Sequence, residues 1–188
     1  MTTLNRIAGF ALCALAAGLP HLSAQTSDIV ELYGGFNYTN TTPEAVVPKA
    51  GLDGFVVGVG AFAFHWFGAA FELSKQYGTV SSSGGTFANA DLHESSFLAG
   101  PQFRFLNTKH VSATAKTLLG GVQGQVFQPG SQESQTRFAV MLGANVDIGI
   151  TKMLAFRVEP GIYRTSFDHQ NQNSFRISFG PVLRFGHE

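Results

Sequence analysis

The sequence predicts an all-β protein, an eight-stranded antiparallel up-and-down barrel whose strands cross a membrane. Three observations support this prediction. Apolar residues recur at every second position over long segments, which is the spacing of one strand face. Charged residues make up only 13% of the chain, against roughly 25% in an ordinary soluble domain. The polar links between the segments are alternately short and long.

The N-terminus is expected to be a cleaved signal peptide. Arg6 gives a weak positive start, residues 7–19 are apolar, and residues 22–24 resemble a cleavage site. The alternative is an N-terminal anchor helix, but the apolar run falls short of the roughly 20 residues that span a bilayer. The expected organisation is therefore a signal peptide over 1–24 and an outer-membrane barrel domain over 25–188.

Eight segments of about nine to thirteen residues are expected to form the strands, close to the length that crosses a membrane. The clearest is the last, where Phe175, Ile177 and Phe179 alternate with Arg176 and Ser178. The poorest is 111–122, in which Lys116 shares a face with Leu118. In chain order the alternating residues that mark these segments run over 30–38, 55–63, 69–74, 97–105, 111–122, 138–148, 156–163 and 175–185.

The links between these segments alternate in length. Those at 64–67, 106–110 and 150–153 are short. The longer and more polar links are 39–51, 79–92, 127–136 and 167–173. Outer-membrane barrels place short turns in the periplasm and longer loops outside, so three turns and four loops fit eight strands.

The apolar strand face is expected to point outward to lipid. The opposite face carries small and polar residues with sparse charges of both signs, which suits a narrow lumen filled by side chains. The alternative is a secreted lipocalin-like carrier with its apolar face turned inward around an apolar ligand. The mid-strand charges assigned to the lumen are Glu31, Glu72, Arg104, Lys116, Asp147, Arg157, Glu159 and Arg176.

Three prolines fall within the expected strands, where each removes a ladder hydrogen bond. They are Pro101, Pro160 and Pro181, and two of them follow glycine. Bulges or kinks are expected at these positions.

Several segments resemble the OmpA/OmpX-type small outer-membrane barrel domains, over residues 27–186. They are 30–36, 71–73 and 174–185. The resemblance implies residence in the bacterial outer membrane, contact with its lipid, and assembly by the barrel-assembly machinery. Members of that family commonly end on an aromatic residue that this machinery reads. Here Gly186-His187-Glu188 follow Phe185, so that signal is displaced.

No catalytic, cofactor-binding or metal-binding residues are predicted. Some small barrels modify lipid A with a His-x-Ser pair near the extracellular side, and His110-Val111-Ser112 has this spacing. Because the pair lies at a short turn, the predicted topology places it in the periplasm, and an enzyme is the less favoured reading. Balanced charge, with 12 basic and 12 acidic residues, argues against nucleic-acid binding.

The expected function is that of a non-enzymatic outer-membrane protein with a structural, surface-contact or adhesion role. Contacts would be made through the loops at 39–51, 79–92 and 127–136. The protein is expected to be a monomer, and the sequence names no loop partner.

Overall fold

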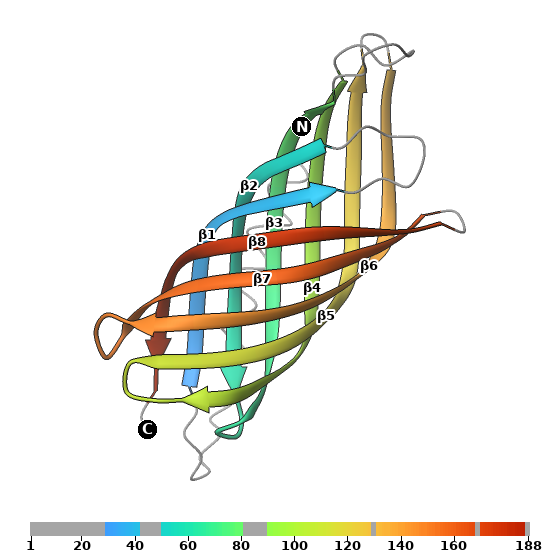
Figure 1. Ribbon diagram of the computed structural model, residues 1–188. Helices are drawn as coiled ribbons and strands as arrows, with labels where there is room; N and C mark the ends of the chain where they lie inside the picture. Colours follow the sequence, from blue (N-terminus) through green and yellow to red (C-terminus); the bar gives the residue numbers. More distant parts are fainter. Residues whose placement is uncertain (1–28, 42–49, 81–89, 129–130, 168–169, 187–188) are drawn as a thin grey trace, which may run out of the picture.

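Eight strands form one closed barrel, in which each strand pairs antiparallel with its neighbours in sequence (Figure 1). The computed structural model describes residues 29–41, 50–80, 90–128, 131–167 and 170–186. The first and last strands pair from Val30↔Phe185 to Thr41↔Ser174 and close the barrel. The predicted fold class is confirmed. The strands are β1 (Ile29–Thr41), β2 (Ala50–Phe62), β3 (Phe67–Val80), β4 (Ala90–Asn107), β5 (Val111–Gln128), β6 (Ser131–Gly149), β7 (Leu154–Phe167) and β8 (Gln170–Phe185).

The predicted signal peptide over 1–24 lies outside the described residues, as do 42–49, 81–89, 129–130 and 187–188. No helix in the described part of the chain is long and apolar enough to cross a membrane.

The three predicted short turns connect β2 to β3, β4 to β5 and β6 to β7 at one end of the barrel (Figure 1). Two of them are organised by threonine. The Thr108 hydroxyl accepts a hydrogen bond from the Val111 amide at 3.1 Å, and the Thr151 hydroxyl accepts one from the Leu154 amide at 3.0 Å. Side-chain bonds of this kind satisfy turn amides that have no ladder partner. β1 begins and β8 ends at this same end, which we call the turn end.

The strands are longer than predicted, at 13 to 19 residues. The predicted loop 127–136 is mostly strand, because β5 continues to Gln128 and β6 begins at Ser131. The backbone makes the ladder bonds, so a hairpin can continue past the lipid-facing region with polar side chains on both faces. Residues 131–137 have no alternating apolar signal, which is why the sequence pattern misassigned them as loop.

The apolar face points outward. On β8, Phe175 is 50% exposed and Leu183 is 44% exposed, whereas Arg176 between them is 2% exposed. The other strands follow the same alternation, with Phe55, Phe97 and other large apolar side chains on the outer surface. The lipocalin-like alternative is therefore wrong, since the barrel interior is the polar face. We call the outward apolar zone the apolar belt; on β4 it runs over 97–105.

The mid-strand prolines interrupt the ladder without shifting it. At each proline, two residue pairs are missing from the ladder with one neighbouring strand, and the pairing then continues in the same register. The interrupted ladders are β4–β5 at Pro101, β6–β7 at Pro160 and β8–β1 at Pro181. Each proline stays paired with its other neighbour. Of the expected bulges or kinks, the bulges are wrong, because a missing amide hydrogen removes bonds on one side only and the register is kept. A register shift does occur at the turn end of β4, between Arg104 and Leu106.

Candidate functional site

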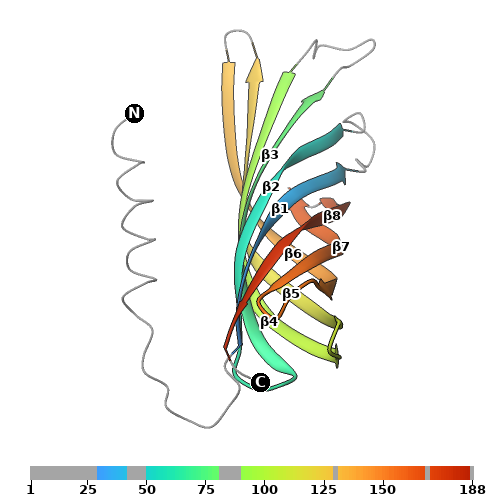
Figure 2. The ribbon, with the colours of Figure 1, turned by 90° about the vertical axis from the view of Figure 1, so that its left-hand side faces the viewer.

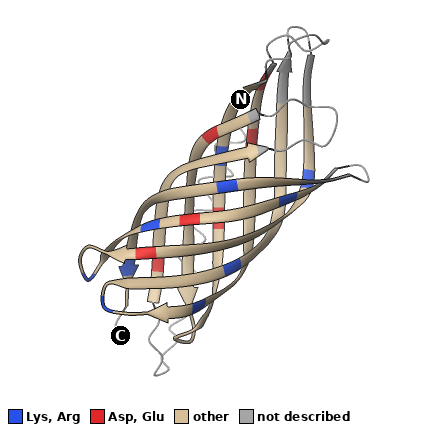
Figure 3. Cartoon of the chain, in the orientation of Figure 1, with Lys and Arg blue, Asp and Glu red and all other residues tan. Residues whose placement is uncertain are grey.

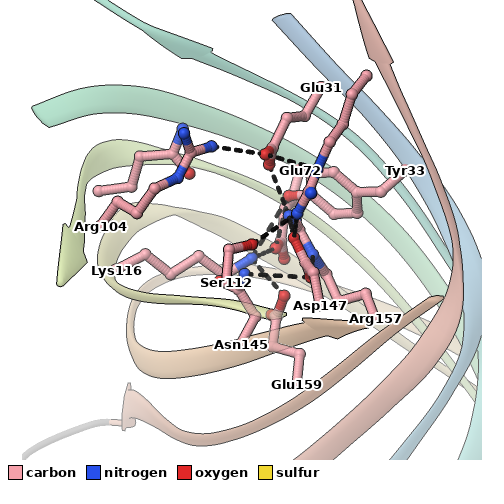
Figure 4. A network of polar contacts seen from close by, with 12 residues as sticks. Glu31, Tyr33, Glu72, Arg104, Ser112, Lys116, Asn145, Asp147, Arg157 and Glu159 are labelled. Atoms are coloured by element: carbon pink, nitrogen blue, oxygen red, sulfur yellow. Dashed lines mark hydrogen bonds and ion pairs between the residues drawn. The ribbon is translucent and has the colours of Figure 1, made fainter. Parts of the chain in front are cut away.

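The charges that the sequence assigns to the lumen all lie there. Each of the eight is 6% exposed or less, and they come from seven of the eight strands. Figure 3 shows these charges along the strands, and Figure 4 shows most of them meeting in one network. Buried charges are tolerable only when they are paired, and each of the eight has at least one ion-pair partner of opposite charge.

Lys116 is at the centre of the network. Its ammonium group is paired with Glu72 and with Glu159, the latter at 2.6 Å from Oε2. Glu72 also accepts a hydrogen bond from the Tyr33 hydroxyl at 2.7 Å and is paired with Arg176 at 3.0 Å. The five residues come from β1, β3, β5, β7 and β8, so these contacts cross the lumen from wall to wall.

A second group lies nearer the turn end. Arg157 binds both oxygens of Asp147, at 2.7 and 2.8 Å, and reaches Oε2 of Glu31 at 2.6 Å. Arg104 binds the other Glu31 oxygen at 2.8 Å. Arg184 donates to Asp147 at 2.7 Å. Fork-shaped contacts between guanidinium and carboxylate groups are the strong and directional kind of ion pair.

Aromatic and small residues complete the packing around this network. The Arg157 guanidinium lies 4.6 Å from the centre of the Tyr33 ring, and that of Arg104 lies 3.8 Å from the Phe62 ring. Gly58 leaves room for Tyr33, because a Cβ there would stand 2.3 Å from the tyrosine ring. The lumen is therefore crossed by side chains at several levels.

Toward the opposite end, which we call the loop end, hydrogen bonds between uncharged polar side chains cross the lumen. Gln76 donates to the Asn37 side chain at 2.8 Å and to the Thr39 hydroxyl at 2.9 Å. The Ser74 and Ser96 hydroxyls are 2.6 Å apart. These bonds join β1, β3 and β4 above the charged network.

Glu94 lies beyond the apolar belt on β4, which ends at Phe97. Burial raises the pKa of this carboxyl to about 7, while the positive charge of Arg176 acts in the opposite direction. Isolated carboxylates lose hydration when buried, so the neutral form gains population near neutral pH.

The sequence analysis missed Tyr33, Arg184 and Gln76 as members of the lumen network. Arg184 lies close to the end of β8, outside the set of mid-strand charges that the sequence assigns to the lumen. Tyr33 and Gln76 carry no charge, and aromatic or amide residues also occur on outer surfaces. Tyr33 lies two positions from Glu31 and Gln76 lies four positions from Glu72, so each shares a strand face with a lumen charge. This spacing is the sequence signal that could have identified them.

The structure does not assemble His110 and Ser112 into a catalytic pair. Ser112 is 1% exposed and accepts a hydrogen bond from Arg184 at 2.6 Å inside the barrel, whereas His110 is exposed on the turn. In the described part of the chain, no group of three His, Cys, Asp or Glu side chains could hold a metal ion.

The second candidate feature is a free sheet edge at the loop end. β6 pairs with β5 from Ser131↔Gln128 onward, but its pairing with β7 begins only at Ala139↔Thr165. Residues 131–136 therefore have no described strand on their second side. In Figures 1 and 2 this part of β6 rises at the margin of a sheet formed by β3, β4, β5 and β6.

The direction of the free backbone groups follows from the turn end of β6. The Gly149 amide donates toward β5, to the His110 carbonyl at 2.7 Å, and the Ile150 amide donates toward β7, to Leu154 at 2.8 Å. Amide directions alternate along a strand, and the β5–β6 register is unbroken. The even-numbered residues of the free edge, Ser134 and Thr136 among them, therefore point their N–H and C=O groups away from β5.

Comparison with known proteins finds no matching protein-family model and no matching curated protein. Solved structures do match. Ail, the attachment invasion locus protein of Yersinia pestis, superposes with a TM-score of 0.61 at 16% identity, over 85% of this chain and 100% of Ail. The Neisserial surface protein NspA superposes with a TM-score of 0.64 at 14% identity, over 84% of this chain and 97% of NspA. The structure of Ail from Yersinia pestis in a phospholipid bilayer nanodisc superposes with a TM-score of 0.50 at 18% identity, over 85% of this chain and 99% of that chain.

The fold is that of small outer-membrane barrels. At these identities the likeness concerns the fold alone. A further structure holds Ail in complex with the heparin analogue sucrose octasulfate.

Proposed function

We propose that this chain is an integral outer-membrane protein that works by surface contact, using the free edge of β6 to bind an extended segment of a partner protein. The closed lumen serves to hold the barrel rigid, and the protein is not an enzyme. The observation that carries the proposal is the stretch 131–136, which pairs with a described strand on one side only.

The outer surface supports the placement in a membrane. Large apolar side chains cover it, and the charges that would make a soluble exterior are instead buried in the lumen. Within the membrane, a closed antiparallel barrel pairs its strands with one another and has no free edge, which makes it one of the two architectures that can cross a bilayer. Short turns in the periplasm would place the loop end, with its free edge, at the cell surface.

The sheet edge supports the contact role. An unpaired edge is a template for another strand, whose backbone adds to the ladder and supplies affinity. The edge is polar: Ser134, Gln135 and Thr136 are exposed, and Gln123 bonds Ser134 across the hairpin at 3.1 Å. The partner segment is therefore expected to be extended and hydrophilic. The fold shared with Ail, named for attachment and invasion, is consistent with this role.

Proline substitution tests the edge directly. The amide of Thr136 points away from β5, so Thr136→Pro removes a group needed by an added strand while the β5 ladder remains. Bacteria that display the protein are compared with the same host lacking it for adherence to a monolayer of epithelial cells. We expect adherence above the host level for the natural protein and a return to the host level for Thr136→Pro.

The matched control is Thr136→Val, which changes the same side chain but keeps the amide hydrogen. It should adhere like the natural protein. Equal amounts of heat-modifiable barrel in the outer membrane must be shown for all variants. Adherence that survives Thr136→Pro, or that never exceeds the host level, would contradict the proposed contact.

A further inference from the structure

Among the residues that the structure describes, the exposed Lys, Arg, Asp and Glu side chains at the turn end of the barrel are all lysines. Lys109 lies on the β4–β5 turn and Lys152 on the β6–β7 turn, and both are exposed. The exposed His65 and His110 lie on turns of the same end. Among the described residues no Asp or Glu is exposed there, because Glu31 and Asp147 are buried in the lumen. Figure 3 shows the tips of the β4–β5 and β6–β7 hairpins in the colour of Lys and Arg.

Apolar side chains lie close to these charges in the sequence and share the turn end. Phe105, 69% exposed, precedes the β4–β5 turn, and Ile150 and Met153 lie within the β6–β7 turn at 63% and 54%. Trp66 lies on the β2–β3 turn, with its ring centre 5.6 Å from that of Phe67 and 6.2 Å from that of Phe103. Aromatic residues in such girdles sit at the level of the lipid headgroups.

Backbone bonds hold each turn to the strand of the next hairpin. The Trp66 carbonyl accepts from the Arg104 amide at 2.8 Å, the His110 carbonyl from Gly149 at 2.7 Å, and the Met153 carbonyl from Arg184 at 2.8 Å. The backbones of the three turns are therefore held in place, which keeps the residues that carry Lys109 and Lys152 at this end of the barrel.

The described residues of the loop end show no such charge bias. Just beyond the apolar belt, the exposed outward charges among them are Asp53, Lys75, Asp91 and Arg164, which balance in sign. An anionic headgroup would meet repulsion as well as attraction there. The asymmetry between the two ends singles out the turn end.

We propose that the turn end binds the headgroups of anionic phospholipids, with Lys109 and Lys152 facing the lipid phosphates and the aromatic and aliphatic residues beside them in the acyl region. This inference rests only on the membrane placement within the proposed function, not on the contact made by β6. Exposed lysines near a negative lipid surface attract it, and the attraction is screened by salt.

Trp66 makes the test local, because it is the only tryptophan in the chain. The purified protein is folded into vesicles of equal parts phosphatidylcholine and phosphatidylglycerol, in which one or the other lipid carries bromine on its acyl chains. Bromine quenches tryptophan fluorescence on contact. We expect brominated phosphatidylglycerol to quench Trp66 more strongly than brominated phosphatidylcholine does. The expected preference for phosphatidylglycerol beside Trp66 is about five-fold, the factor that the attraction of one lysine to an anionic lipid surface supplies.

The double variant Lys109→Gln/Lys152→Gln should lose this preference, and raised salt should reduce it in the natural protein. The matched control, Lys75→Gln/Arg164→Gln, removes two charges from the loop end and should keep it. Equal quenching by both lipids in the natural protein, or a preference that survives in the turn variant, would overturn the proposal while leaving the membrane placement intact. Quenching by neither lipid would overturn the membrane placement as well.

Discussion

At the scale of single residues, Lys116 shows what the lumen demands of its side chains. It is 3% exposed, and its ammonium group has Glu72 and Glu159 as ion-pair partners. Removing one partner from a buried ion pair leaves an uncompensated charge, which costs more than the pair itself contributes.

Lys116→Met is therefore expected to lower the free energy of unfolding by about 3–5 kcal/mol. Urea titration of the protein in detergent micelles, followed by circular dichroism, measures this change. Lys75→Met, on the exposed outer face, is the control and should change it by less than about 0.5 kcal/mol. Adding Glu159→Gln to Lys116→Met should restore part of the loss, because the two side chains interact directly. Simply additive losses would contradict the assigned pairing.

Glu94 is expected to make the free energy of unfolding depend on pH. Its pKa in the folded barrel is about 7, above the ordinary 4.5, so the folded state holds the proton more tightly than the unfolded chain. Its contribution to stability is therefore present below about pH 4.5 and is lost as the pH rises through 7. Glu94→Gln, which stays neutral, should match the natural protein in acid and be more stable by about 1–2 kcal/mol in mild alkali. Urea midpoints on the two sides of this range measure the difference, and a difference independent of pH would contradict the burial of Glu94.

At the scale of elements, the closure of β1 on β8 depends on glycine. Gly35 and Gly180 lie where Pro181 interrupts this ladder, and the two backbones come very close. A Cβ on Gly35 would stand 2.1 Å from the Phe179 carbonyl oxygen, whereas one on the neighbouring Gly34 would make ordinary contacts at 3.5 Å.

Gly35→Ala should therefore destabilise the barrel by about 1–3 kcal/mol, the range for overpacking a filled site. Gly34→Ala, one position away and on the outer face, should be close to neutral. Heat-modifiability on a denaturing gel gives the temperature at which each variant unfolds. If Gly35→Ala and Gly34→Ala lowered the unfolding temperature equally, barrel closure would not require the close approach of the β1 and β8 backbones at Gly35.

The strands also show which parts of the fold could be predicted from the sequence. Alternation in 175–185 was sufficient to place β8 and its faces, because a lipid-facing strand must be apolar at every outward position. The same rule says nothing of 131–137, which extend β6 beyond the belt with polar residues on both faces. The eight lumen charges could be assigned by parity, but their pairing could not. Which strands face each other across a closed barrel depends on its tilt and stagger, and no local pattern encodes these.

At the scale of the whole molecule, the distribution of polarity is inverted relative to a soluble barrel. Ion pairs link strands across the interior, and most of the large aromatic and aliphatic side chains lie on the outer surface. In water this surface would remain unburied, so the fold is expected to need a lipid or detergent phase to provide its hydrophobic stabilisation.

Folding with and without detergent tests this account most directly. The purified chain is refolded in buffer alone and in detergent micelles, and boiled and unboiled samples are compared on a denaturing gel alongside circular dichroism. We predict a β-rich species that forms only with detergent and changes its mobility on boiling. A stable monomeric barrel formed in buffer alone would contradict the outward assignment of the apolar face, and with it the membrane placement.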